Sequence, residues 1–206
     1  MFYKHLPTGG SQGAVQKVAR NIGDIVSDSG LDFSKTEAWG FLSRAKAFLE
    51  AAEVLKTEIV THNRITLFAP TLHNAGHGLE LLLKGCLIHN GVPTADAVNY
   101  RHNVNAMWEL PQVSKLREIA AINAKTTHAE ALASGLYPDA ATVADPAKLF
   151  EEYRHELGRL HAEAGKFPLR YPTHVDERAP RTPLLVGTLW RTADDYVKRP
   201  NEFRMI

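Results

Sequence analysis

The feature that most constrains the fold is residues 70–90, a segment with apolar side chains on two opposite sides of a helix. Its main apolar stripe recurs at three- and four-residue steps and consists of Leu72, Ala75, Leu79, Leu82 and Cys86. Leu81 and Ile88 fall on the opposite side, because successive helical residues are rotated by about 100°. A helix that is apolar nearly all round is typical of the centre of a bundle. We therefore predict a central helix that begins near Pro70 and ends at Asn90.

Four other segments show the periodicity of amphipathic helices, and no segment predicts a strand. They run from a capping box at Ser34–Glu37 to about Ile59, from about His102 to Ser134 with a break at Pro111, from Asp145-Pro146 to Gly165, and from Thr182-Pro183 to about Tyr196. Short connections between such helices predict an all-α fold, an antiparallel bundle of four or five helices over residues 34–200. Residues 1–33 are expected to form an N-terminal arm with a short helix, and 201–206 a tail.

The composition excludes several classes of protein. The chain has 206 residues and a formal net charge of +1, so any binding of nucleic acid needs a local basic patch. A single cysteine, Cys86, cannot form an internal disulfide, which is typical of a reducing cytoplasm. No apolar run reaches the roughly 18 residues of a membrane span, and the start lacks the apolar core of a signal peptide. We expect a cytoplasmic protein with no membrane association and no cofactor.

A polar row runs along the central helix between its apolar sides: His73, His77, Glu80 and Lys84. In one interpretation the row is exposed, and Glu80 and Lys84 form a surface ion pair. In the other it lines a cleft or a dimer interface, because this helix has little surface left for bulk water. His73 and His77 also have the spacing of a two-histidine metal site, with Glu80 as a third ligand. Asn74 replaces the glutamate that metallopeptidases use as a base. Because histidine pairs at this spacing are common by chance and no independent ligand set is evident, we assign no metal here.

A second polar set lies on the helix predicted after Asp145. Arg154 and His161 are seven residues apart, about 10.5 Å along the axis, and on the same side. An arginine and a histidine beside one phosphate suit metal-free RNA cleavage, because arginine stabilises the charge on the phosphorane and histidine exchanges a proton near neutral pH. The alternative is a solvated, charged helix edge.

The sequence Leu169-Arg170-Tyr171-Pro172 forms a third polar set. Pro172 favours an extended conformation at Tyr171, which predicts an ordered corner that presents Arg170 and Tyr171. An arginine beside an aromatic ring suits a phosphate and a stacked base. The alternative is a packed corner in which the tyrosine fills a gap between two helices.

Three motifs together resemble the HEPN superfamily of small helical bundles. Residues 75–85, AGHGLELLLKG, are similar to the family helix small-x-x-x-Leu-Glu-x-x-Leu-Lys-Ala/Gly. Residues 100–104, YRHNV, resemble the His-Asp-Leu opening of the third HEPN helix, with asparagine in place of aspartate. Residues 169–172 are similar to the Arg-Tyr-Pro corner before the final helix. The resemblance spans roughly residues 36–198 and implies the HEPN fold.

Many HEPN proteins are metal-independent endoribonucleases of toxin–antitoxin, phage-defence or RNA-processing systems. They act as dimers that bring together two Arg-polar-(x)-His motifs with four to six residues between arginine and histidine. Arg154 and His161 fit this spacing, since six residues intervene. Other members bind nucleotide or pair with a nucleotidyltransferase.

The resemblance and the polar sets together lead to one functional hypothesis. We expect a homodimeric HEPN-like domain that binds RNA or nucleotide, with Arg154 and His161 as the catalytic residues if it cuts RNA. The expected RNA or nucleotide contacts are His77, Glu80, Lys84, Arg101, His102, Arg170 and Tyr171. An antitoxin or a nucleotidyltransferase is the expected protein partner. The alternatives are a non-catalytic dimeric scaffold or accessory subunit, and a metal-binding helical bundle.

Overall fold

The computed structural model describes residues 32–135, 137–162, 168–169 and 179–205, and the fold is all-α, as predicted. The helices are α2 (Glu37–His62), α3 (Phe68–His89), α4 (Thr94–Asn99), α5 (Val104–Trp108), α6 (Ser114–Ser134), α7 (Pro146–His161) and α8 (Thr182–Lys198). Short 3-10 turns lie at η1 (Phe33–Lys35), η2 (Ile65–Leu67), η3 (Pro111–Val113), η4 (Pro138–Thr142) and η6 (Pro200–Phe203). The chain divides into two compact units, Met1–Lys35 and Thr36–Ile206, and the helical bundle is the second.

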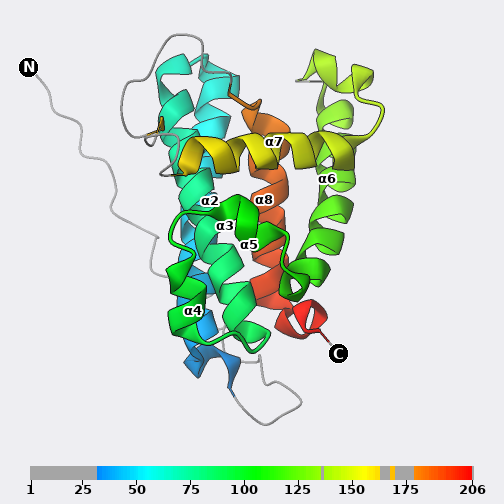
Figure 1. The fold of residues 1–206 in the computed structure, drawn as a ribbon. Helices are drawn as coiled ribbons and strands as arrows, with labels where there is room; N and C mark the ends of the chain where they lie inside the picture. The colour runs from blue at the N-terminus through cyan, green and yellow to red at the C-terminus, as the bar shows by residue number, and fades with distance from the viewer. Residues whose placement is uncertain (1–31, 136, 163–167, 170–178, 206) are drawn as a thin grey trace, which may run out of the picture. The chain divides into compact units, whose positions relative to one another are not determined.

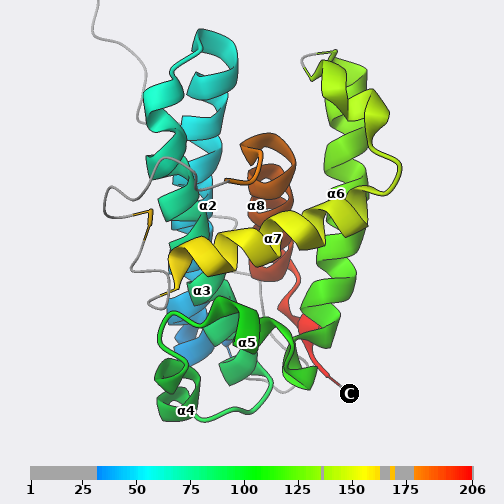
Figure 2. The same cartoon turned by 45° about the horizontal axis from the view of Figure 1, so that its top comes forward.

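Helix α3 is the central helix, as its apolar pattern predicts. It packs against α2, α4, α5, α7 and α8, and the whole predicted stripe is buried. Leu83 and Leu87, which border this stripe, are also buried, whereas Leu81 and Ile88 on the opposite side are only half-buried, so that side is less covered than predicted. Figures 1 and 2 show α7 running crosswise over the bundle, where it contacts α3, α8 and α6.

Glycines allow α2 and α3 to pack closely. A Cβ atom at Gly78 would lie 2.6 Å from Leu49 Cγ, and one at Gly85 would lie 2.7 Å from Leu42 Cγ. Both leucines are fully buried in α2, so neither has room to move away. The two glycines are seven positions apart, about two turns, so both lie on the side of α3 that faces α2 and form a strip without side chains there.

The helix starts agree in part with the predicted caps. Asp145 caps α7 as predicted, since its carboxylate accepts the backbone N–H groups of Ala147 and Lys148. The predicted capping box at Ser34 is wrong, because the N-cap of α2 is Thr36, whose hydroxyl accepts the N–H of Trp39 at 3.3 Å. Ser34 instead lies in the preceding 3-10 turn.

Several other boundaries differ from the sequence pattern. Helix α7 ends at His161 and not at Gly165, because Ala162 takes an extended conformation. Thr182 is the first residue of α8, with Arg181 as the N-cap. Helix α4 was missed altogether, since its six residues are too few for an apolar period. Pro111 does separate two helices, α5 and α6, as predicted.

The C-terminal segment, predicted to be a tail, packs at one end of the bundle. Phe203 is buried and stacks on Tyr196 with ring centroids 4.0 Å apart. The Asn90 side chain donates to the carbonyl oxygens of Phe203 and Gln112, each at 3.1 Å, and accepts the N–H of Met205 at 2.8 Å. One side chain at the end of α3 therefore holds η6 against the bundle.

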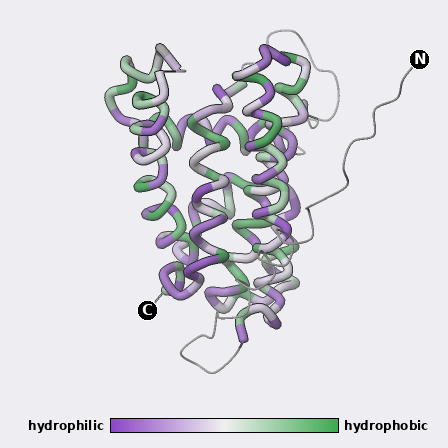
Figure 3. Tube along the Cα trace, turned by 180° about the vertical axis from the view of Figure 1, so that it is seen from behind, coloured by the Kyte–Doolittle hydropathy of each residue, from purple (hydrophilic) through white to green (hydrophobic). Residues whose placement is uncertain are grey.

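Residues 1–31 of the predicted arm lie outside the described residues, and Phe33, the last residue of that arm, is buried in η1. Within the described residues, none of the helices combines the length and the apolar character that crossing a bilayer requires. Figure 3 agrees with this, since polar and apolar residues are interleaved along the helices.

The glycine strip generates a stability prediction. We expect Gly85→Ala to destabilise the fold by about 1–3 kcal/mol, because the added methyl group overpacks Leu42. Gly40→Ala in α2 is the matched control, since a Cβ there has nothing within 4 Å, and its better helix propensity should stabilise by up to about 1 kcal/mol. Urea unfolding measures both. Two changes of the same sign would contradict the close packing of α2 and α3.

His89 generates a prediction on pH. Its Nδ1 lies 2.9 Å from the Tyr196 hydroxyl, and burial, with a smaller contribution from Arg204, lowers the pKa of His89 to about 4. The unfolded chain therefore takes up a proton between about pH 6.5 and pH 4 that the folded chain does not, so the free energy of unfolding falls as the pH falls through this window.

We expect His89→Gln to make this pH dependence shallower by up to about one proton. Urea unfolding at several pH values between 7 and 4.5 measures the slope, and His155→Gln, which changes an exposed histidine of α7, is the control. Equal slopes in the wild type and in His89→Gln would show that His89 is not held neutral by the fold.

Candidate functional site

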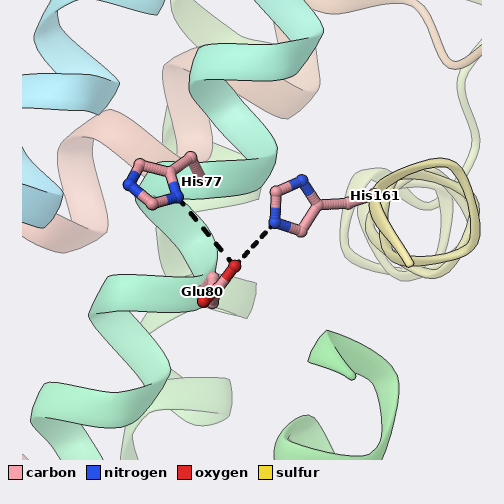
Figure 4. A group of neighbouring side chains, drawn as sticks. All are labelled: His77, Glu80 and His161. Atoms are coloured by element: carbon pink, nitrogen blue, oxygen red, sulfur yellow. Dashed lines mark hydrogen bonds and ion pairs between the residues drawn. The ribbon is translucent and has the colours of Figure 1, made fainter. Parts of the chain in front are cut away.

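A buried carboxylate lies at the centre of the polar row on α3. Glu80 is 4% exposed, and its Oε1 accepts a hydrogen bond from Lys84 Nζ at 2.7 Å. Its Oε2 accepts from His161 Nε2 at 2.8 Å and from His102 Nδ1 at 2.9 Å. His77 Nδ1 lies 3.9 Å from the same oxygen. Figure 4 shows His77 and His161 pointing at Glu80 from two sides. We call Glu80, Lys84, His77, His102 and His161 the Glu80 cluster.

The members of the Glu80 cluster come from three parts of the chain. Helix α3 supplies Glu80, Lys84 and His77 at helical spacing, the turn between α4 and α5 supplies His102, and the last residue of α7 supplies His161. Only a glycine at position 76 leaves room for His161 beside α3, because a Cβ atom there would lie 2.8 Å from His161 Nδ1.

Glu80 is ionised in this environment. Burial alone would raise the pKa of Glu80, but the hydrogen bonds from His161, Lys84 and His102 outweigh it and hold the pKa far below its usual range. An ionised carboxylate only accepts hydrogen bonds, so each imidazole nitrogen bonded to it carries a proton. Glu80 therefore fixes His102 as the Nδ1–H tautomer when that ring is neutral, which leaves the Nε2 lone pair as the acceptor.

The three histidines differ in accessibility. The side chains of His77 and His102 are 32% and 30% exposed, whereas that of His161 is 1% exposed. The Phe48 and His77 rings are nearly perpendicular, with their centroids 4.4 Å apart. A ligand from solvent can therefore contact His77 and His102, whereas the buried His161 contacts only the protein and binds the Glu80 carboxylate.

Arg101, beside His102, has an unusual backbone conformation. Its φ is +50°, in the left-handed region that non-glycine residues seldom adopt. Such strained residues are concentrated at functional sites. The Arg101 side chain is exposed, next to the partly exposed His102 in the sequence, where a ligand from solvent can reach both.

Arg154 lies elsewhere on α7 and makes a different set of contacts. It is 4% exposed, donates to Asn105 Oδ1 at 2.7 Å and to Glu151 Oε2 at 3.0 Å, and its guanidinium lies 4.8 Å from the Trp108 ring centroid. The alternative of a solvated, charged edge on this helix is wrong for Arg154, which is buried, as is His161. They lie at the contacts of α7 with α5 and α3, and the structure brings His161, not Arg154, to Glu80.

Other predicted residues have mixed outcomes. The alternative in which Glu80 and Lys84 form an exposed pair is wrong, because both are buried. The His73 ring lies 6.5 Å from the His161 ring, and His73 is not part of the set His77, Glu80 and His161, whose ligand atoms all lie within 4.8 Å of one another. Arg170 and Tyr171 lie outside the described residues.

Two residues that position the site, Gly76 and Asn105, were not predicted from the sequence. Gly76 admits His161 against α3, and Asn105 packs on Gly158 of α7 while it binds Arg154 and donates to the His155 carbonyl at 3.1 Å. The run Ala75-Gly76-His77-Gly78 was a usable signal, because small residues in a central helix indicate close neighbours. No local signal marks Asn105.

A second group of charged residues lines a cavity of about 260 Å³ between α2, α6 and α8. Lys56 pairs there with Glu53 at 2.5 Å, and Arg191 pairs with Glu130 at 2.6 Å. These charges are matched in separate ion pairs, whereas the Glu80 cluster gathers three imidazoles on one carboxylate. The Glu80 cluster is therefore the stronger candidate site.

Comparison with known proteins identified no similar family, curated protein or solved structure: none of the three searches found a match. The candidate site therefore rests on the geometry of its own residues.

The buried ion pair between Glu80 and Lys84 leads to a prediction about stability. We expect Glu80→Gln to lower the free energy of unfolding by about 3–5 kcal/mol, because it leaves the Lys84 charge buried without its partner. Adding Lys84→Met should restore part of the loss, since no unpaired charge remains. Urea unfolding measures all variants, with Glu118→Gln in the exposed Lys115–Glu118 pair as the control, where we expect at most about 1 kcal/mol. A small effect of Glu80→Gln would show that the pair is not buried in solution.

Proposed function

We propose that this chain is a homodimeric HEPN-like domain that binds RNA at the Glu80 cluster and cleaves it without a metal ion. The observation that carries the proposal is the hydrogen bond of 2.9 Å from His102 Nδ1 to the buried, ionised Glu80. A carboxylate that fixes one nitrogen of a partly exposed imidazole leaves the other as a general base, as in hydrolytic triads. The resemblance of residues 75–85 and 100–104 to HEPN motifs supports the choice of RNA as substrate.

In this mechanism, His102 Nε2 removes the proton from a ribose 2′-hydroxyl. The 2′-oxygen attacks the adjacent phosphorus, and the bond from phosphorus to the 5′-oxygen breaks. Protonated His77, on the same carboxylate oxygen, gives its proton to the leaving 5′-oxygen, and Arg101 stabilises the charge on the phosphorane. The products are a 2′,3′-cyclic phosphate and a 5′-hydroxyl.

The other members of the Glu80 cluster have positioning roles. Lys84 and His161 are buried and hold the two carboxylate oxygens of Glu80, which keeps the carboxylate ionised and oriented toward His102. Arg154 contributes indirectly, since its bond to Asn105 fixes α7 on α5. We therefore propose His102, and not His161 as the sequence suggested, as the residue that transfers the proton.

The cleavage assay uses labelled single-stranded RNA in EDTA at low salt. We expect wild-type protein to produce 2′,3′-cyclic phosphate ends and His102→Ala to be slower by about 100- to 10,000-fold. His155→Ala, on the exposed side of α7, should cleave like the wild type. RNA with a 2′-deoxyribose at the cleaved position should resist. Equal rates in His102→Ala and wild type, at equal folding, would remove His102 from the mechanism.

The second candidate function is a non-catalytic dimeric scaffold or an accessory subunit, such as the partner of a nucleotidyltransferase. The observation that favours it is the burial of Glu80, Lys84 and His161, because a buried network with satisfied hydrogen bonds also serves to specify one packing arrangement. A dimer with no RNA binding at low salt, where phosphate contacts are strongest, would select this function.

A further inference from the structure

We infer that the chain also binds one divalent transition-metal ion, of the Zn²⁺ class, through His77, Glu80 and His161. This goes beyond the proposed function, which uses no metal, and either can fail without the other. The first observation is geometric: one atom of each residue, two imidazole nitrogens and a carboxylate oxygen, lies within 4.8 Å of the others. Figure 4 shows the two rings directed at the carboxylate from separate helices.

The distances lie close to those of a metal site. Zinc ligands sit about 2.0–2.2 Å from the ion, so neighbouring ligand atoms in a tetrahedral site are about 3.4 Å apart. Glu80 Oε2 is 2.8 Å from His161 Nε2 and 3.9 Å from His77 Nδ1. The first separation must open and the second must close by about half an ångström, and the two imidazole nitrogens, which lie within 4.8 Å of each other, must also approach. Rotation of the partly exposed His77 ring is enough to bring its nitrogen nearer.

The ligand set determines the class of metal. Two imidazoles and one carboxylate are the three protein ligands of many zinc enzymes, and they leave a fourth position for water or substrate. Nitrogen ligands favour Zn²⁺, Co²⁺ and Ni²⁺ over Mg²⁺ and Ca²⁺, which prefer an all-oxygen shell.

The surroundings of the ligands also fit a metal. Lys84 holds the second oxygen of Glu80 at 2.7 Å, the kind of outer contact that orients a ligating carboxylate. Gly76 keeps His161 close to α3, and the exposed part of His77 gives an ion access from solvent. When the ion binds, His161 Nε2 presents its lone pair to the metal and its proton moves to Nδ1 or to solvent.

This site differs from the sequence-based alternative. The spacing of His73 and His77 predicts a pair on one helix, but the histidine that joins His77 and Glu80 is His161, from another helix. A metal bound there links α3 to α7, and so it should stabilise the folded state. His73 is consequently a matched control, one turn before His77 on the same helix.

The test uses the full chain purified without a histidine tag and stripped with EDTA. We expect the wild type to take up one Zn²⁺ per chain in competition with a chromophoric chelator, and Zn²⁺ to raise the unfolding temperature. His77→Ala should weaken Zn²⁺ binding by at least about tenfold and abolish the thermal shift. His73→Ala should bind like the wild type, and Mg²⁺ should give no shift. Co²⁺ should produce the visible absorption of a site with nitrogen and oxygen ligands.

His77→Ala is the decisive variant, since His77 is partly exposed and its loss should leave the fold intact. No uptake by the wild type, or equal uptake by wild type and His77→Ala, would overturn the metal site. Loss of binding in His73→Ala with retention in His77→Ala would overturn the ligand assignment. The RNA assay is run in EDTA, so its result does not depend on this one.

Discussion

The arrangement of this bundle depends on one buried carboxylate. Glu80 accepts hydrogen bonds from its own helix, from the turn before α5 and from the end of α7, which lie far apart in the sequence. A buried charge is strongly unfavourable unless it is paired, so the fold must bring His102 and His161 to Glu80 together. The position of α7 across the bundle and the conformation of the α4–α5 turn both satisfy this requirement.

Small residues supply the space that the carboxylate network needs. Gly76 admits His161 against α3, and Gly158 admits Asn105 against α7. Asn105 in turn binds Arg154, which packs on Trp108. Along α7, the contacts of Arg154 with Asn105, of Gly158 with Asn105 and of His161 with Gly76 therefore combine hydrogen bonds with close packing. Gly78 and Gly85 likewise allow α2 to pack closely against α3, so α3 lies close to both α2 and α7.

The sequence predicted the helices better than it predicted the site. Apolar periodicity located the central helix, and Pro111 and Asp145 marked real boundaries, because these signals act on neighbouring residues. The six residues of α4 and the cap at Thr36 were missed, since short elements depend on tertiary packing. His77, Glu80 and His102 were predicted as contacts of one ligand, but His161 was paired with Arg154 and not with Glu80. Only the crossing of α7 over α3 shows that they share one carboxylate, and helical spacing carries no information on that crossing.

The two proposed uses of the Glu80 cluster compete for the same oxygen. Proton transfer by His102 requires Glu80 Oε2 to accept the hydrogen bond from His102 Nδ1. A metal ion would instead bind this oxygen, and the nitrogens of His77 and His161 would then bind the ion through their lone pairs. Lys84 keeps its bond to Oε1 in both states, so the carboxylate stays ionised either way. Bound Zn²⁺ should therefore prevent proton transfer by His102 without disrupting the fold. The buried His161 distinguishes the two states, because its Nε2 carries a proton in the metal-free state and binds the ion in the metal-bound state.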